Sequence, residues 1–197
     1  MNPQFSELID AVYKFFKDLD NPYLNALLAD WPNDIFQSRP VVPIDLPVLS
    51  WMSEAVSAAH DCSVRIVKLL ASLAPRLAWG QTYSAEDFGS GFLERYGWTE
   101  LMGLRGSIAS DRIACGFLML GPGIEYPQHS HEAEEVYVPL TGPTFWMRGS
   151  EEWKLRPPCQ PIHHAPRVPH AMRTQSVPLL ALYFWRGGNL TEKSSIH

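Results

Sequence analysis

The chain has 197 residues, of which 46% are hydrophobic and 19% are charged, and a formal net charge of −5. This length fits one large domain or a small domain with an extension, and this composition supports a packed core and excludes extended disorder. No run of lysine or arginine interrupts the acidic balance, which argues against nucleic acid or an anionic membrane as the main partner.

The N-terminus and the cysteines predict a cytoplasmic protein. The first residues lack the basic start and apolar stretch of a secretory signal, and no segment approaches the ~18 apolar residues of a membrane helix. Cys62, Cys115 and Cys159 are odd in number and far apart, which favours reduced thiols over a disulfide framework. None belongs to a CxxC pair, so a thiolate zinc site is not expected.

Residues 1–78 have helical periodicity and are predicted to form an extension of four helices. Asn21 and Pro22 supply the N-cap and first-turn proline of the second helix, and Pro75 ends the fourth. The apolar positions that define the helices are Phe5, Leu8, Ile9, Val12, Phe15, Phe16 and Leu19; Leu24, Leu27, Leu28 and Trp31; Leu49, Met52, Val56 and Ala59; Val64, Val67, Leu70 and Leu73.

Residues 79–197 consist of short segments rich in β-branched and aromatic residues, separated by glycine and proline. Their regular spacing is typical of an antiparallel sandwich or barrel, and not of βαβ units. The predicted fold class is therefore mainly β, with the helical extension packed on a C-terminal barrel as one structural unit. The predicted strands are Glu100–Leu104, Ile113–Leu120, Glu135–Leu140, Thr144–Arg148, Glu152–Leu155 and Leu179–Trp185.

Four side chains form a pattern typical of a metal site. Side chains alternate between the faces of an extended strand, so His129 and His131 point the same way and can bind one cation together. Glu135 follows on the next strand, and His170 comes later, in a proline-rich turn. Three imidazoles and one carboxylate suit one divalent transition metal, such as Zn²⁺, Fe²⁺ or Mn²⁺.

The segment Gly123–Gly142 resembles the first sequence motif of the cupins, G-x5-H-x-H-x3-E-x6-G, at every fixed position. The resemblance implies a cupin barrel (a double-stranded β-helix, or jelly roll) in which His129, His131 and Glu135 bind the metal.

The second cupin motif, which implies His170 as the fourth ligand, is matched less well. It usually has a glycine between its proline and its histidine, and an asparagine after the histidine. Here Val168 or Pro169 is expected to occupy the turn, and Thr174 stands where the asparagine would be.

Two further histidines, His163 and His164, compete with His170. If their segment is a strand, one of them must face the barrel interior as a ligand or an active-site polar group. His60, in the helical part, and His197, at the terminus, are expected to have no role in the site.

Two tyrosines are the candidate catalytic groups. Tyr137 lies two residues after Glu135 and therefore on the same face of the strand. A divalent cation nearby lowers the ordinary phenol pKa of ~10, so this side chain can act as a general base. Tyr126 lies three residues before His129 and could project over the same cavity.

The pattern H-x-H-x3-E-x-Y, with a preceding tyrosine and a helical N-terminal part, resembles the cupin-type dimethylsulfoniopropionate (DMSP) lyases of marine bacteria. The resemblance implies a carbon–sulfur lyase in which the substrate carboxylate binds the metal, a tyrosine removes the α-proton, dimethyl sulfide leaves and acrylate remains. It implies the following site residues: His129, His131, Glu135 and His170 for the metal, Tyr137 and Tyr126 for catalysis, and Trp185 for the substrate pocket.

A zwitterionic sulfonium substrate can be held by aromatic faces, each of which contributes ~0.5–2 kcal/mol through cation–π attraction. Trp185 is the first candidate, and Tyr183, Trp146 and Phe184 are weaker ones. Tyr183 and Trp185 share one face of the last predicted strand, whereas Phe184 points to the other.

Other functions stay open. An Fe(II)-dependent cupin dioxygenase would use the same four ligands, and a sugar isomerase is a weaker alternative because the pocket is expected to be aromatic. A cupin that only binds a small ligand is a third alternative, although the N-terminal helices lack the basic recognition helix of a DNA-binding sensor. The chain is expected to be a monomer or a homodimer.

Overall fold

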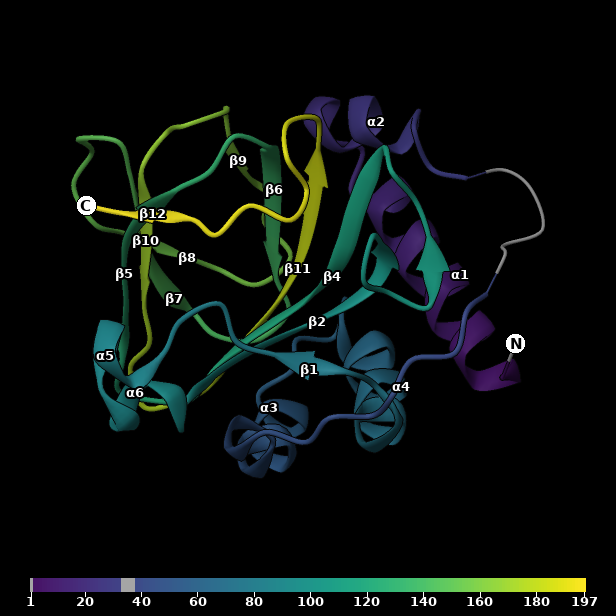
Figure 1. The fold of residues 1–197 in the computed structure, drawn as a ribbon, viewed down its shortest axis with the longest axis horizontal. Helices are drawn as coiled ribbons and strands as arrows, with labels where there is room; N and C mark the ends of the chain where they lie inside the picture. The colour runs from purple at the N-terminus through teal and green to yellow at the C-terminus, as the bar shows by residue number, and fades with distance from the viewer. Residues whose placement is uncertain (1, 33–37) are drawn as a thin grey trace.

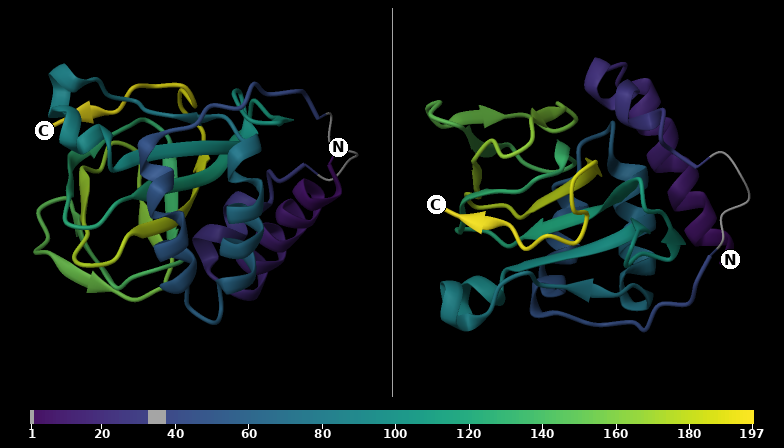
Figure 2. Two further views of the ribbon diagram at one scale, coloured as in Figure 1. Left: turned by 90° about the horizontal axis from the view of Figure 1, so that it is seen from below. Right: turned by 45° about the horizontal axis from the view of Figure 1, so that its top comes forward.

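The computed structural model describes residues 2–32 and 38–197, which form a barrel of two facing β-sheets with helices packed on its outside (Figure 1). Helices α1–α4 lie against the larger sheet, and the two termini lie on opposite sides of the molecule (Figures 1 and 2). The prediction of a mainly β fold with packed helices is confirmed. Among the described residues, no helix has the length and apolar character needed to cross a membrane.

All six predicted strands are present; two match the prediction at both ends, and the other four are shifted by up to four residues at one or both ends. The larger sheet has the order β1-β2-β4-β11-β6-β9, with β3 beside β2, and the smaller has the order β12-β5-β10-β7-β8. The strands are β1 Trp79–Gly80, β2 Tyr96–Gly103, β3 Ile108–Ala109, β4 Ile113–Leu120, β5 Glu125–Ser130, β6 Glu134–Pro139, β7 Thr144–Arg148, β8 Lys154–Arg156, β9 Ile162–His164, β10 His170–Arg173, β11 Leu179–Arg186 and β12 Ser195–Ile196.

The four predicted helices are also present, although the third begins as a 3₁₀ turn. Asn21 caps the second helix as predicted, because its side chain accepts hydrogen bonds from the backbone of Tyr23 and Leu24. The short helices α5 and α6, inside the predicted barrel segment, were not predicted. The bounds are α1 Pro3–Asp18, α2 Pro22–Leu28, η1 Pro47–Trp51, α3 Met52–Ser57, α4 Val64–Leu73, η2 Ala74–Arg76, α5 Ala85–Phe88 and α6 Ser90–Leu93.

Both faces of the larger sheet are buried, one by the helices and the other inside the barrel. Phe184 on β11 points outward and stacks on Phe16 of α1, with ring centroids 5.5 Å apart. Its neighbours Tyr183 and Trp185 point into the barrel, as the alternation of side chains predicts. The helices therefore fix the sheet from behind and leave its inner face to build a site.

Two of the three cysteines contradict the prediction of reduced thiols. Cys62, after α3, and Cys159, after β8, form a disulfide with Cα atoms 6.7 Å apart, and only Cys115 is free and buried. Backbone hydrogen bonds from His60 and Cys159 to the end of β6 bring the two segments together. The pairing spans a sequence separation of 97 residues, so spacing alone does not reveal it. The cysteine argument for a cytoplasmic location therefore fails, and that location stays a prediction, as does the division at residues 78 and 79.

Reduction of this disulfide should destabilise the protein measurably. A crosslink across 97 residues restricts the unfolded chain, and loops of this size give about 2–4 kcal/mol of stability. We expect the urea midpoint of the oxidised protein to fall on addition of dithiothreitol. A Cys62→Ser/Cys159→Ser variant should have the urea midpoint of the reduced protein, and the reductant should not change it. Identical unfolding curves with and without reductant would contradict the prediction.

Candidate metal centre and active site

Three of the four predicted metal ligands form one cluster inside the barrel. His131 follows β5, Glu135 is on β6 and His170 is on β10, and their ligating atoms all lie within 4.8 Å of one another. His129 pairs with His170 across β5 and β10, with ring centroids 4.2 Å apart. All four side chains are buried.

The three predicted histidine ligands share one orientation. In each, Nδ1 lies 2.8–3.0 Å from the backbone carbonyl oxygen of a residue two positions away. Nδ1 can therefore carry the proton and donate it to that carbonyl, which leaves the Nε2 lone pair for a metal. Such contacts are typical of metal-binding histidines. They favour His129, beside the cluster, as the fourth ligand.

The cluster has the electronic properties that a cation requires. Nε2 of His131 lies 2.9 Å and Nε2 of His170 lies 3.3 Å from the same carboxylate oxygen of Glu135. Burial opposes ionisation of Glu135, but the two histidines outweigh it and hold the pKa of its carboxyl well below the usual range. Burial and His170 lower the pKa of His129, which favours its neutral, metal-binding form. These residues therefore fit a divalent transition metal.

Trp185 contacts two of these ligands. Its indole Nε1 donates to Oε1 of Glu135 at 2.5 Å, and its ring stacks on His131 with centroids 4.1 Å apart. The ladder between β11 and β6 places Trp185 directly opposite Glu135. The side chain that the sequence suggested for the substrate pocket thus also contacts two of the candidate metal ligands.

Replacing Trp185 with phenylalanine should weaken metal binding about 10–100-fold, the usual effect of losing a hydrogen-bond partner of a ligand. Phenylalanine keeps an aromatic ring at this position, whereas Glu135 loses the hydrogen bond that the indole N–H donates. Competition with a chromogenic chelator measures the affinity. Trp146→Phe is the matched control, since the buried Nε1 of Trp146 has no partner among the described residues. Equal affinities of the two variants would refute the role of the indole N–H.

The two candidate tyrosines lie in the same cavity but in different surroundings. The Tyr126 hydroxyl donates to the Tyr83 hydroxyl at 3.1 Å, and its ring stacks on His129 with centroids 4.0 Å apart. The Tyr137 hydroxyl instead lies close to the Glu135 carboxylate. Burial, followed by the Glu135 carboxylate, raises its pKa well above the usual range. Tyr137 therefore lies beside a candidate metal ligand, and it needs a nearby positive charge to ionise.

The competing histidines point to opposite sides of β9. His164 faces the interior opposite Glu135 and stacks on His170 with ring centroids 4.0 Å apart. Neither of its nitrogens has a partner within the described part of the chain, so it lacks the carbonyl contact that the other three histidines share. His163 faces outward and lies 3.0 Å from Glu134.

The remaining two histidines lie away from the ligand cluster. The Nδ1 of His60 lies beside the sulfur of Cys62, and the Nε2 of His197 lies 2.8 Å from the hydroxyl of Ser130.

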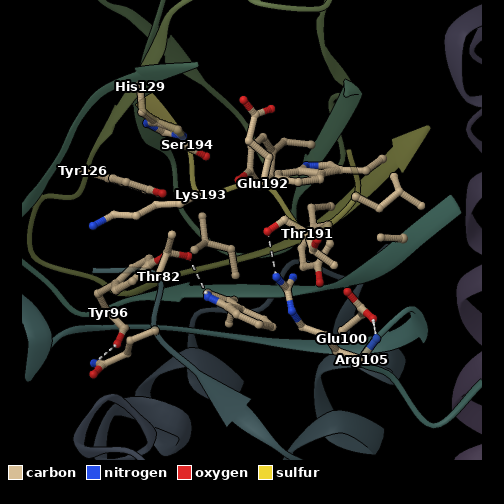
Figure 3. Close-up of a pocket in the computed structure, with 18 residues that line it drawn as sticks. Thr82, Tyr96, Glu100, Arg105, Tyr126, His129, Thr191, Glu192, Lys193 and Ser194 are labelled. Atoms are coloured by element: carbon tan, nitrogen blue, oxygen red, sulfur yellow. Dashed lines mark hydrogen bonds between the residues drawn. The ribbon is translucent and has the colours of Figure 1, made fainter. Parts of the chain in front are cut away.

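One cavity of about 320 Å³ opens beside the cluster (Figure 3). Sequence reasoning found Tyr126, His129, Tyr137, Tyr183 and Trp185 in its wall, and did not find the residues of β2 and of the C-terminal segment. Trp146 and Phe184 do not line it. The lining residues that the sequence did not indicate are Gln81, Thr82, Tyr96, Trp98, Glu100, Arg105, Ala114, Leu118, Leu190, Thr191, Glu192, Lys193 and Ser194.

A two-sheet barrel that carries H-x-H-x3-E across β5 and β6 and a facing histidine on β10 defines a cupin. The signature of the dimethylsulfoniopropionate lyase family matches residues 33–181, and the chain therefore belongs to that family. Over 155 residues, which are 78% of this chain and 77% of the relative, it is 31% identical to the DMSP lyase DddQ of Ruegeria pomeroyi.

Solved structures agree with this assignment. The crystal structure of DMSP lyase DddQ from Ruegeria pomeroyi superposes with a TM-score of 0.89 at 26% identity, over 100% of this chain and 97% of that chain. A chain from the crystal structures of the DMSP lyases RdDddP and RnDddQII superposes with a TM-score of 0.88 at 29% identity, over 98% of this chain and 97% of that chain.

Proposed function

We propose that this protein is a metal-dependent carbon–sulfur lyase that cleaves DMSP to dimethyl sulfide and acrylate. The observation that carries the proposal is that Tyr137 and His129 line one cavity beside the cluster of His131, Glu135 and His170. A base and a metal site thus face the same small space, in a chain of the DMSP lyase family.

His129, His131, Glu135 and His170 would hold one Zn²⁺, Fe²⁺ or Mn²⁺ ion. When bound, the ion supplies a Lewis acid for the substrate carboxylate and so stabilises negative charge that develops at the α-carbon.

Tyr137, as phenolate, removes the α-proton of the substrate. The electron pair of the broken C–H bond forms the new C=C bond, the bond between the β-carbon and sulfur breaks, and its pair leaves with dimethyl sulfide. The structure favours Tyr137 over Tyr126 for this step because the Tyr126 hydroxyl is engaged with Tyr83. Tyr183 and Trp185 offer aromatic faces to the sulfonium from the adjacent strand.

Headspace gas chromatography of the purified protein with added Zn²⁺, Fe²⁺ or Mn²⁺ and DMSP, with oxygen excluded, tests the proposal. Dimethyl sulfide with equimolar acrylate is the expected result, and it would also exclude an Fe(II) dioxygenase as the source of the products. Absence of dimethyl sulfide with every metal and across a range of pH would refute the lyase function.

A further inference from the structure

A row of paired residues crosses the larger sheet from Tyr137 to the far wall of the cavity. Tyr137 on β6 lies opposite Tyr183 on β11. Gly116 on β4 lies between Tyr183 and Glu100, the β2 residue at the end of the row. Residues paired in this way project from the same face, and neighbouring strands lie about 4.8 Å apart, so Glu100 is about 14 Å from Tyr137 along the sheet.

The glycine in this row lets β2 and the Tyr183 side chain approach β4 closely, because a Cβ at Gly116 would clash with the Thr99 carbonyl oxygen. A Cβ at Gly116 would come within 2.8 Å of the Tyr183 hydroxyl and 2.9 Å of the Glu100 Cα. The phenol of Tyr183 therefore lies over Gly116, and both Tyr183 and Glu100 line the cavity (Figure 3 labels Glu100). A ligand in this cavity therefore has both Tyr183 and Glu100 in the surrounding wall.

Glu100 is a buried carboxylate held by backbone amides. Its side chain is part of a residue that is only 8% exposed, and Oε1 accepts hydrogen bonds from the backbone N–H groups of Arg105 and Gly106 at 2.5 and 2.7 Å. Arg39 fixes the same turn by donating to the carbonyls of Gly103 and Gly106. Oε2 has no hydrogen-bond partner in the described part of the chain. The Glu100 carboxylate is thus held in place, and its Oε2 is available to interact with a ligand.

The cations nearest this carboxylate are engaged elsewhere. The Arg105 guanidinium donates to the Thr191 carbonyl and lies 5.4 Å above the Trp98 ring. Lys193 pairs with Asp87 at 3.0 Å. Burial raises the pKa of Glu100, whereas the amide donors and the two arginines lower it. Within the described residues no side-chain cation forms an ion pair with Glu100.

We infer that Glu100 selects the positive charge of the substrate, so that the site takes short carboxylates with a β-sulfonium or quaternary ammonium group in preference to neutral carboxylates of the same shape. The inference rests on the proposed function, which places the substrate carboxylate at the metal cluster. Tyr183 and Glu100 line the same cavity as His129 and Tyr137, so an onium group held in that cavity has both side chains in its surroundings. A neutral group in that place would leave the desolvated Glu100 carboxylate without a partner, which lowers the affinity for the neutral ligand.

A pair of ligands that differ only in charge tests the inference. In 3-(trimethylammonio)propanoate and 4,4-dimethylpentanoate, a cationic nitrogen and a neutral carbon carry the same three methyl groups. We expect zinc-loaded wild-type protein to bind the ammonium ligand at least about tenfold more tightly in calorimetric titrations. In Glu100→Gln this preference should fall at least about fivefold, while the affinity for the neutral ligand does not fall.

The glutamine variant separates charge from structure, because its amide oxygen can still accept both backbone hydrogen bonds. Glu152→Gln, at an exposed position before β8, makes the same change in net charge and should keep the wild-type preference. An unchanged preference in Glu100→Gln would overturn the inference, as would a wild-type protein that binds both ligands equally.

A crystal structure of the wild-type complex with the ammonium ligand provides a second measurement that does not depend on the variant. An ammonium group between Tyr183 and Glu100 supports the inference, and one directed toward Lys193 contradicts it. Turnover is scored separately. A protein that releases dimethyl sulfide but keeps its preference in Glu100→Gln refutes only this inference. A protein that loses the preference but releases no dimethyl sulfide refutes only the proposed reaction.

Discussion

Replacing Tyr137 with phenylalanine should leave metal binding intact and lower the turnover of DMSP by about 10²–10⁴-fold, the range expected for loss of a general base. The change removes one hydroxyl and keeps the ring, which packs 5.2 Å from Trp146 between centroids. The Glu135 carboxylate, which lies close to that hydroxyl, keeps its contacts with His131 and Trp185, so we expect little loss of stability. The measurement is the initial rate of dimethyl sulfide release, together with the metal content of the same sample.

Two further tyrosine variants make this result specific. Tyr126→Phe loses only a hydroxyl that donates to Tyr83, and should therefore reduce the rate much less than Tyr137→Phe does. Tyr13→Phe, on α1 beside Trp31, is the control far from the cavity. If Tyr126→Phe abolished turnover while Tyr137→Phe kept it, the assignment of the base would be wrong. A loss of metal in Tyr137→Phe would show that the hydroxyl acts through the metal site.

The barrel and the cluster of candidate metal ligands could be predicted because their signals are local. Strands such as Ile113–Leu120 and Thr144–Arg148 are bounded by turn residues and match the prediction at both ends. His129, His131 and Glu135 lie within seven residues, at the end of β5, just after it and on β6, so alternation and one tight turn are enough to direct them to the barrel interior. The cluster then needs only His170 from a distant segment.

The second cupin motif shows where local reasoning fails. The turn was expected to centre on Val168 or Pro169, but the structure corrects this: Arg167 has the positive φ, 61°, that a glycine usually adopts. Its backbone N–H donates to the His131 carbonyl at 2.8 Å. This contact between the two motifs stabilises a backbone conformation that the arginine side chain does not favour. Thr174, at the asparagine position, donates to the Gly121 carbonyl and so joins the end of β10 to the loop between β4 and β5.

The far wall of the cavity could not be predicted for a different reason. Glu100 belongs to a strand that the sequence indicates, but its place in the cavity depends on the register of β2 against β4 and of β4 against β11. A shift of one residue in either ladder would turn Glu100 away from the barrel. The Cys62–Cys159 pair depends in the same way on tertiary structure. Sequence patterns thus locate the metal site, whereas the groups expected to select the substrate come from long-range pairing.

Replacing His131 with alanine should abolish both tight metal binding and turnover. His131 contributes Nε2 to the cluster and contacts Glu135 at 2.9 Å, so its loss removes one ligand and leaves the carboxylate less well compensated. We expect metal affinity to fall at least about 10²-fold, beyond the effect of losing an outer hydrogen-bond partner. The wild type should gain about 2.7 kcal/mol of stability at a metal concentration 100 times the Kd, and the variant should gain almost nothing at that concentration.

Thermal melts with and without Zn²⁺, combined with metal analysis after dialysis, measure both effects without any assay of activity. His163→Ala is the control, because it removes another imidazole, from a residue that is only partly buried and faces outward from β9, where it contacts Glu134 and stacks on Tyr23. The His163→Ala variant should lose some stability but still bind one metal ion per chain, and Zn²⁺ should raise its melting temperature as much as that of the wild type. If His131→Ala kept that increase, the ion would have to bind outside the cluster of His131, Glu135 and His170, and the proposed chemistry at Tyr137 would lose its electrostatic basis.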